Sequence, residues 1–356
     1  GYGNMASDKE YIDLASDMGW PYMLVDWGWC DPVMPGVVPH DPNAELKVND
    51  TLDLPALLAY AKQKNVKLVL WLHSNNLNRI GIDKTFATVE KWGAAGVKID
   101  FMDRSDQDIV KWYEEVLASA AKHHLLVNFH GAYVPTGLAR TWPNYITQEG
   151  ILGNEFSKFG VKPNQRCDPK HHITLPFTRG LLGPGDFTPG GFLNRSVSEW
   201  RAGSPTQVMG TRARQLALAT LLDSPLLCMA DSPANYRGQT GLEYFRGLPT
   251  VWDETRVLSA NLAEHLVEAR RKGDIWYIAA MNHDKPLTLR VPLDFLGSGT
   301  HTIRIFADKP ESATTPTEIT DTARPVTAKD LLEIPMVANG GFAARIRRGR
   351  HSPPAA

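Results

Sequence analysis

Apolar segments of strand length alternate with amphipathic segments over roughly the first two thirds of the chain. Apolar residues spaced three and four apart predict helices over 8–18, 54–64, 85–94, 106–123 and 212–222. Short apolar runs between them predict strands over 22–26, 67–72, 97–101, 125–129, 144–147, 173–177 and 225–229. Strands that are apolar throughout and joined by helices are typical of a parallel sheet covered on both faces. The pattern therefore predicts an α/β fold, a (β/α)8 barrel of the TIM type.

The number of predicted strands bears on where the barrel begins. A barrel of this type has eight strands, whereas only the seven runs above are found here. The chain opens with a linker and a helix already directed at a strand. We therefore expect the first barrel strand to lie upstream of residue 1, so that the seven runs are strands two to eight of a barrel over 1–258.

The pattern changes after about Ser259. Short strands are predicted over 275–281, 287–291, 301–306 and 342–346, separated by Asn-His-Asp, Gly-Ser-Gly and Asn-Gly-Gly turns. Helical spacing occurs only over 328–332. This part is predicted to form a small antiparallel β domain over 259–350, of the sandwich type, followed by a tail over 351–356.

Polar side chains follow the predicted strands directly. In a β/α barrel, the C-terminal ends of the strands meet at one mouth, where catalytic groups lie. The residues at these ends are Asp26, His73, Asp100, His130, Glu149 and Asp231, with Glu155 and Arg140 in the loops close behind. The chain lacks the nucleophile-elbow, dinucleotide-binding, phosphate-loop and His-Glu-x-x-His motifs. Paired carboxylates in such a mouth suit glycoside hydrolysis, in which one acid protonates the leaving oxygen and another attacks the sugar or activates water.

The segment GVKIDFMDR over 96–104 contains two acids with different predicted roles. Asp100 lies inside the apolar run, too early to cap the following helix, and so is the candidate for catalysis. Asp103 is predicted to cap the helix that begins near Asp106. Lys98 lies two residues before Asp100, on the same face of the strand. Its ammonium could contact sugar hydroxyls or pair with Asp26, and the two roles are compatible.

Charge and composition exclude some partners. The formal net charge is −1 and no long run of Lys and Arg occurs, so a nucleic-acid partner is not expected. There is no apolar run of transmembrane length and no signal peptide, and no membrane partner is predicted. The three cysteines, Cys30, Cys167 and Cys228, have no metal-type spacing.

The segment HGAYVPTGLARTWPNYITQEGILGNEFSK over 130–158, taken with GVKIDFMDR, resembles glycoside hydrolase family 97. The resemblance extends over residues 1–350. This family contains inverting α-glucosidases and retaining α-galactosidases, built from an N-terminal β super-sandwich, a (β/α)8 barrel and a C-terminal β domain. The resemblance implies that the first domain and the first barrel strand are missing from this chain.

The resemblance also implies roles for individual residues. Glu155 matches the general acid of the family, and Glu149 matches a ligand of a calcium ion that lies near Glu155 as well. The retaining members have their nucleophile at the end of strand four, the position of Asp100. The inverting members carry a base glutamate directly after the histidine that ends strand five, where this chain has Gly131. The resemblance therefore implies a retaining, exo-acting α-galactosidase that works by double displacement, with Asp100 as nucleophile and Glu155 as acid and base.

Further expectations concern the substrate and the alternatives. The sugar contacts are predicted to be Asp26, Trp27, His73, Lys98 and His130, although each histidine could instead be a hydrogen-bonded residue of the barrel. The resemblance implies an oligosaccharide or α-galactoside substrate, one Ca²⁺ ion, and a periplasmic or secreted location. Three alternatives stay open: an inverting α-glucosidase of the same family, a non-catalytic carbohydrate-binding barrel, and an unrelated hydrolase with zinc on His73 and His130. The sequence does not predict the oligomeric state.

Overall fold

The computed structural model describes residues 4–31, 36, 38–159 and 166–348. They form two compact units: unit 1 comprises 1–151 and 182–186, and unit 2 comprises 152–181 and 187–356. This division falls inside the barrel predicted over 1–258, and the predicted domain boundary at 258 stays a prediction. The predicted tail over 351–356 lies outside the described residues.

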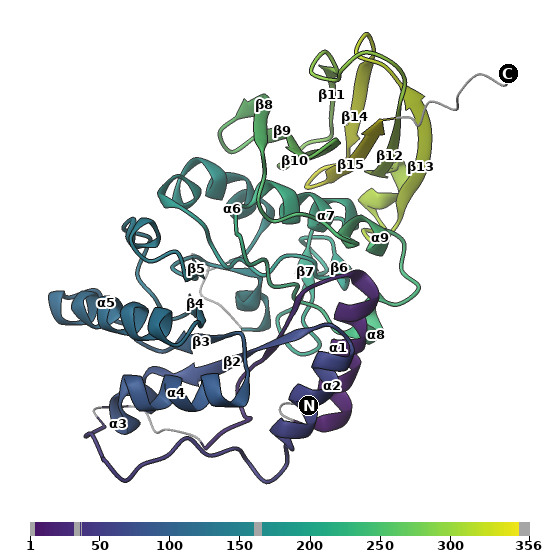
Figure 1. The fold of residues 1–356 in the computed structure, drawn as a ribbon. Helices are drawn as coiled ribbons and strands as arrows, with labels where there is room; N and C mark the ends of the chain where they lie inside the picture. Colours follow the sequence, from purple (N-terminus) through teal and green to yellow (C-terminus); the bar gives the residue numbers. More distant parts are fainter. Residues whose placement is uncertain (1–3, 32–35, 37, 160–165, 349–356) are drawn as a thin grey trace, which may run out of the picture. The chain divides into compact units, whose positions relative to one another are not determined.

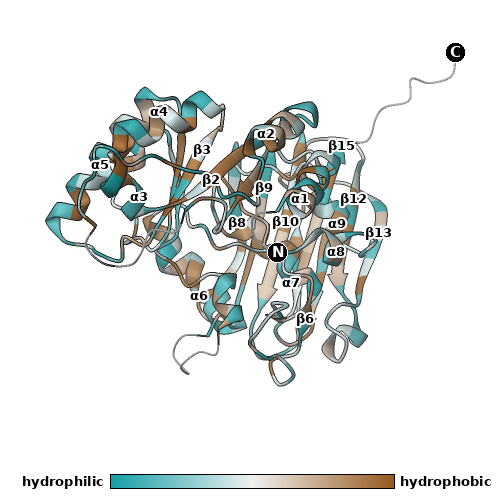
Figure 2. Ribbon diagram, turned by 90° about the horizontal axis from the view of Figure 1, so that it is seen from below, coloured by the Kyte–Doolittle hydropathy of each residue, from teal (hydrophilic) through white to brown (hydrophobic). Residues whose placement is uncertain are grey.

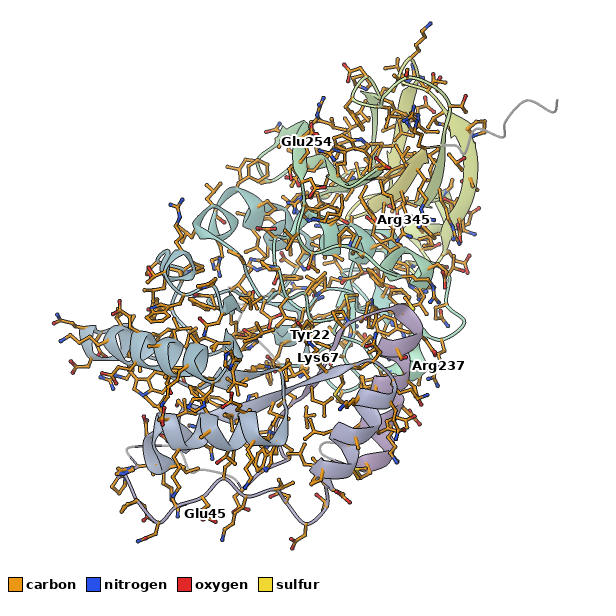
Figure 3. The ribbon with its side chains drawn as sticks, viewed as in Figure 1. Tyr22, Glu45, Lys67, Arg237, Glu254 and Arg345 are labelled. Atoms are coloured by element: carbon orange, nitrogen blue, oxygen red, sulfur yellow. The ribbon has the colours of Figure 1, made fainter. Side chains whose placement is uncertain are left out.

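Unit 1 is built on a five-stranded parallel sheet whose strand order follows the sequence. The strands are β1 (Tyr22–Val25), β2 (Lys67–His73), β3 (Gly96–Asp100), β4 (Leu126–Phe129) and β5 (Tyr145–Gln148), which confirms the first five predicted strands. Each strand pairs in parallel with the next, starting from the partners Tyr22 and Lys67 (Figure 3). The C-terminal ends of all five strands therefore lie at one edge of the sheet.

In the part of unit 1 that the structure describes there are five α-helices, and their ends follow local signals. They are α1 (Met5–Met18), α2 (Leu54–Gln63), α3 (Ser74–Ile80), α4 (Ile82–Trp92) and α5 (Gln107–Lys122). The prediction that Asp103 caps α5 is wrong. The cap is Asp106, whose carboxylate accepts hydrogen bonds from the backbone N–H groups of Asp108 and Ile109. Asp103 is thereby left for another role.

The core of unit 1 lies between this sheet and its helices. Helices α1, α2 and α5 pack on β1, β2 and β4 respectively (Figure 1). The side chains of Leu70, Val97, Ile99, Val127 and Phe129 are completely buried. In Figure 2 the strand β2 carries the brown colour of apolar residues, whereas α4 and α5 also show teal, polar stretches. This is the pattern of a parallel sheet with amphipathic helices over it.

Unit 2 departs from the predicted barrel pattern in two places. Residues 173–177, predicted as a strand, form the end of α6 (Pro169–Thr174) and the 3-10 helix η3 (Leu175–Phe177). Asp168 caps α6 by accepting from the N–H of His171, and Pro169 occupies the first helical turn, so the helix signal outweighs the short apolar run. The run over 225–229 is not a strand either.

Unit 2 also contains short elements between α6 and the C-terminal strands. They are β6 (Asn194–Arg195) and β7 (Val208–Met209), which pair in parallel, and α7 (Arg212–Leu221), α8 (Pro233–Tyr236) and α9 (Leu242–Phe245). Among the described residues, the remaining 3-10 helices are η1 (Leu138–Arg140), η2 (Asn154–Lys158), η4 (Arg179–Leu182) and η5 (Pro310–Ala313). Every residue of α7 is buried.

The C-terminal part of unit 2 is an antiparallel β sandwich, as predicted. One sheet has the order β13-β12-β15-β10-β9-β8, and the other is the pair β11-β14. The strands are β8 (Glu254–Asn261), β9 (His265–Lys272), β10 (Ile275–Asn282), β11 (Leu287–Pro292), β12 (His301–Asp308), β13 (Ile319–Val326), β14 (Leu331–Met336) and β15 (Gly341–Arg348). Figure 3 labels Glu254 on β8 and Arg345 on β15. Side chains of both sheets share one apolar core, with Ile278 and Ile303 from one and Leu332 and Ile334 from the other.

The helix predicted over 328–332 is not present in the structure. Residues 328–332 form a turn and the start of β14, because Asp330 accepts hydrogen bonds from the N–H and hydroxyl of Thr327. No helix in the described ranges is long and apolar enough to cross a membrane.

Candidate active site

Asp100 ends β3, at the edge of the sheet where the strands of unit 1 terminate. Its Oδ1 accepts a 2.7 Å hydrogen bond from the backbone N–H of Phe101. Its Oδ2 accepts a 3.1 Å hydrogen bond from the indole Nε1 of Trp71 on the neighbouring strand. Phe101 has a left-handed backbone (φ +63°), and such conformations in non-glycine residues concentrate at functional sites.

Aromatic side chains form a wall beside Asp100. The ring of Trp27 lies 4.8 Å from that of Trp71 and 5.9 Å from that of Phe101, and His73 stacks on Phe101 at 5.2 Å. Trp27 keeps 44% of its surface exposed. A pocket of about 210 Å³ lies here, lined by Trp27, Gly28, Cys30, Asp31, Asn49, Trp71 and His73. Apolar faces with a few polar groups are the usual composition of a small-molecule site.

Lys98 and Asp26 form an ion pair next to this wall. The Nζ of Lys98 lies 2.8 Å from Oδ2 of Asp26, which confirms the predicted pairing. Burial would raise the pKa of Asp26, but the Lys98 ammonium outweighs that effect and holds the pKa below its ordinary value. Burial would likewise lower the pKa of Lys98, yet the carboxylates of Asp26 and Asp186 raise it. Both groups are therefore charged at neutral pH.

His130 pairs with Asp186, an acid that the sequence patterns did not single out. The Nε2 of His130 lies 2.7 Å from Oδ2 of Asp186, and Asn128 donates to the same oxygen at 2.7 Å. Asp186 is only 2% exposed. Burial would raise its pKa, but the hydrogen bond from His130 and the charges of His130 and Lys98 keep the pKa low. Burial alone would lower the pKa of His130, and the bond to Asp186 raises it.

Asp186 was missed because its surroundings carry no element signal. It follows Gly183-Pro184-Gly185, and an aspartate in such a run is typical of a turn. It is also 56 residues from His130 in the chain. Only its burial beside a lysine and a histidine distinguishes Asp186 from an ordinary loop residue.

Glu149 and Gly131 meet at the ends of β4 and β5. The backbone N–H of Gly131 donates to Oε2 of Glu149 at 2.9 Å, and Nδ1 of His130 lies 3.7 Å from the same oxygen. Gly131 has a left-handed backbone (φ +55°). A Cβ at this position would lie 2.8 Å from Oδ1 of Asp103 and 2.9 Å from the backbone nitrogen of Phe101. No side chain fits at position 131 unless the β3 loop moves.

Asp103 belongs to this group rather than to the helix end. Its backbone N–H donates to the carbonyl of Gly131 at 2.8 Å, and its backbone is left-handed (φ +48°). Partial burial raises the pKa of Asp103, and the nearby charge of Asp100 adds to the rise. One carboxylate at the end of β3 and another in the loop that follows it therefore lie at this edge of the sheet.

The predicted sugar contact His73 has a local structural role. Its Nδ1 accepts a 3.0 Å hydrogen bond from the N–H of Asn75, which caps α3. Burial lowers the pKa of His73, despite the opposing charges of Asp100 and Asp103. These bonds agree with the interpretation of His73 as a hydrogen-bonded residue of the sheet edge, and its contact with a sugar stays a prediction.

Two predicted candidates lie in unit 2. Glu155 lies on η2, half-exposed, with Oε1 3.3 Å from Nζ of Lys158, and its approach to Asp100 stays a prediction. Asp231 does not follow a strand. Its carboxylate accepts from the N–H groups of Phe192 and Ser232 and from the side chain of Asn235, which is an ordinary loop-stabilising role.

Comparison with known proteins agrees with this arrangement. The family described as Glycoside hydrolase 97 matches residues 2–151, and the one described as Glycosyl-hydrolase 97 C-terminal, oligomerisation, matches residues 251–347. A probable retaining alpha-galactosidase of Streptomyces bingchenggensis is 37% identical over 345 residues, 96% of this chain and 49% of that protein. A retaining alpha-galactosidase of Bacteroides thetaiotaomicron is 32% identical, over 97% of this chain and 51% of that protein. The chain thus spans about half the length of these curated relatives.

Solved structures show the same likeness. A Glycoside Hydrolase Family 97 enzyme from Pseudoalteromonas sp. strain K8, in complex with acarbose, superposes with a TM-score of 0.82 at 28% identity. The match covers 97% of this chain and 56% of that one. A parallel α/β sheet with carboxylates at its C-terminal edge, joined to a C-terminal β domain, places the chain among the glycoside hydrolases. Since both matching regions are those of one family, the chain belongs to glycoside hydrolase family 97.

Proposed function

We propose that this chain carries the catalytic machinery of a retaining, exo-acting α-galactosidase that cleaves terminal α-galactosides by double displacement. Asp100 is the nucleophile and Glu155 is the acid and base. In this proposal β1–β5 are strands two to six of a (β/α)8 barrel. The observation that carries the proposal is the pairing of a carboxylate at the end of β3 with a glycine at position 131.

The first step forms a covalent intermediate. One oxygen of Asp100 attacks the anomeric carbon and forms a C–O bond, while the glycosidic C–O bond breaks and its electron pair goes to the leaving oxygen. Glu155 gives its proton to that oxygen. In the second step Glu155 takes a proton from water, and the water oxygen attacks the same carbon and releases Asp100 as a carboxylate. This chemistry needs carboxyl groups about 5–5.5 Å apart.

The surroundings of position 131 support retention over inversion. An inverting enzyme of the family would hold its base as a glutamate at this position. Here a Cβ would collide with Oδ1 of Asp103 and with the backbone of Phe101. The positive φ of Gly131 adds strain to any replacement. Asp100, at the end of β3, is then proposed as the nucleophile.

The substrate is proposed to bind along the aromatic wall. The pocket lined by Trp27, Trp71 and His73 supplies apolar faces for a sugar ring, and Asp26 and Lys98 supply charged hydrogen-bonding groups. The relatives named as retaining alpha-galactosidases favour a galactoside over a glucoside. Because residues 251–347 match a C-terminal oligomerisation domain, self-association of the protein is part of the proposal. A periplasmic or secreted location is proposed as well.

One calcium ion is proposed at Glu149 and Glu155. The residues fit the ion chemically, because calcium prefers carboxylate oxygens and the Gly131 N–H already fixes the orientation of the Glu149 carboxylate. When bound, the ion would supply positive charge that holds the carboxylates in place. Glu149 would then position Glu155 rather than exchange protons itself.

The test is hydrolysis of an aryl α-galactoside by the full-length protein, with the first-formed anomer followed by NMR. The expected first product is α-galactose. Asp100→Gly should be inactive, and azide should restore turnover and yield the β-galactosyl azide. Asp294→Gly, in an exposed loop, is the control.

Other outcomes would point elsewhere. A first-formed β-anomer, with preference for α-glucosides, would replace the proposal with inversion. Unchanged, azide-independent hydrolysis by Asp100→Gly would remove Asp100 from the mechanism. Sugar binding without hydrolysis by the wild-type protein would favour the non-catalytic barrel.

A further inference from the structure

Trp71 contacts the proposed nucleophile from the neighbouring strand. Its indole Nε1 donates to Oδ2 of Asp100 at 3.1 Å, while the N–H of Phe101 holds Oδ1 at 2.7 Å. In the sheet, His73 and not Trp71 is the register partner of Asp100. The indole therefore reaches the carboxylate diagonally across the strand pair.

The indole ring is held in place on several sides. The backbone carbonyl of Trp71 accepts a 2.6 Å hydrogen bond from Nε1 of Trp29, which is itself completely buried. The ring of Trp27 lies 4.8 Å away, and the rings of Phe101 and His73 lie 6.2 and 6.3 Å away, both edge-on. Trp71 is only 5% exposed, so its N–H cannot turn to water without repacking these rings.

This arrangement solves a geometric problem of a carboxylate nucleophile. An aspartate carboxylate rotates broadly about its last torsion, yet attack requires one oxygen to point at the anomeric carbon. The N–H of Phe101 belongs to the next residue in the chain and moves with Asp100. Trp71 belongs to another strand, so its bond ties the plane of the carboxylate to the sheet. An indole N–H is only a hydrogen-bond donor, so Trp71 cannot take up a proton during the reaction.

We propose that Trp71 is a positioning residue that sets the plane of the Asp100 carboxylate for attack on the sugar. The inference rests on the proposed function of Asp100 as nucleophile. The bond persists through the reaction, because the oxygen that is not bonded to the sugar in the ester intermediate still accepts a hydrogen bond. Trp71 therefore acts on both the formation and the breakdown of that intermediate.

The experiment removes the N–H and keeps the ring. In the full-length protein, Trp71 is replaced by 3-benzothienylalanine, which carries sulfur in place of the indole N–H, and Trp71→Phe is made in parallel. The assay measures the pre-steady-state release of the aryl group from an activated aryl α-galactoside, together with kcat and KM. We expect the rate constant for glycosyl-enzyme formation and kcat to fall about 10- to 100-fold, as for the loss of one hydrogen bond to a charged group. KM should change less than about threefold.

Two comparisons separate positioning from packing. Trp112→Phe, in α5 and away from the pocket, should leave the kinetics unchanged, and thermal melting should show that the benzothienyl protein is folded. A benzothienyl protein with wild-type rates would overturn the inference, and so would a loss confined to KM. If Asp100→Gly is inactive and rescued by azide in that case, the proposed function stands and only the role of Trp71 falls.

Discussion

The imidazole of His130 donates from Nε2 to the carboxylate of Asp186 at 2.7 Å, and the two residues are only 3% and 2% exposed. This pair connects the residue that follows β4 to the segment 182–186, which belongs to unit 1 although it lies far along the chain. The positive charge of Lys98 also acts on Asp186, and Lys98 in turn pairs with Asp26. A chain of alternating charges therefore underlies the edge of the sheet where Asp100 lies.

We expect Asp186→Asn to destabilise the protein strongly. The change leaves His130 and Lys98 buried without their shared anion, and breaking a buried ion pair costs about 3–5 kcal/mol. The measurement is urea denaturation. Asp83→Asn is the matched control, since Asp83 pairs with Lys122 and His123 at the surface of unit 1 and its loss should cost about 0–1 kcal/mol. Equal losses of unfolding free energy for the two variants would show that the buried charges add no more stability than the surface pair.

The crowding at Gly131 leads to a second expectation. Gly19 and Gly131 both have left-handed backbones, but an added Cβ at Gly19 meets nothing within 4 Å, whereas at Gly131 it meets Asp103 and Phe101. Gly19→Ala should therefore cost only the backbone strain of about 1–2 kcal/mol. Gly131→Ala should lower the free energy of unfolding, measured by urea denaturation, by more than Gly19→Ala does. It should also lower kcat, because the loop after Asp100 must shift. A Gly131→Ala enzyme as stable and active as Gly19→Ala would show that the loop adapts freely.

A third expectation concerns pH and Asp308, at the end of β12. Burial raises the pKa of Asp308 to about 6, although hydrogen bonds from Thr211 and from the N–H groups of Gly341 and Val337 oppose the rise. The ordinary value is about 3.9. Between about pH 4 and pH 6 the native protein therefore binds more protons than the unfolded chain, and this group makes stability fall as pH rises.

Replacing Asp308 with asparagine tests this sign. Asp308→Asn keeps an acceptor for the N–H groups of Val337 and Gly341 but cannot ionise. Its free energy of unfolding should rise relative to wild type between pH 4 and pH 7, by about 1–3 kcal/mol. Urea titrations at several pH values measure the difference, with Asp294→Asn as an exposed control. If the unfolding free energy of Asp308→Asn relative to wild type falls as pH rises, the expected direction of the effect is wrong.

A fourth expectation concerns calcium. Removing the ion with a chelator should lower both the melting temperature and the activity of the full-length protein, because ligand-bound native protein is stabilised by mass action. Added Ca²⁺ should restore both. Glu149→Gln should bind less metal per chain in elemental analysis and should lose the response to the chelator. Stoichiometric zinc in place of calcium would support the alternative metal hydrolase, and wild-type protein without calcium would remove the ion from the proposal.

Local signals in the sequence were sufficient for most elements of unit 1. The first five strands are confirmed, because each is a short apolar run, and the first four also follow α-helices. The strand predicted over 173–177 is wrong because the cap at Asp168 and the proline after it favour a helix. The assignment of Asp103 as a helix cap is wrong for a related reason. Asp103 and Asp106 both lie close before α5, and spacing alone does not show which one accepts the hydrogen bonds of the first turn.

The sequence by itself determined the alternation of strands and helices, the position of Asp100 at a strand end and the membership of its family, since these depend on residues close together in the chain. Only the tertiary structure decided that Asp186 pairs with His130, that Trp71 donates to Asp100 and that Gly131 has no room for a side chain. These relationships join residues on different strands and loops. They arise from how the strands pair and how the loops pack at their ends, which no local pattern records.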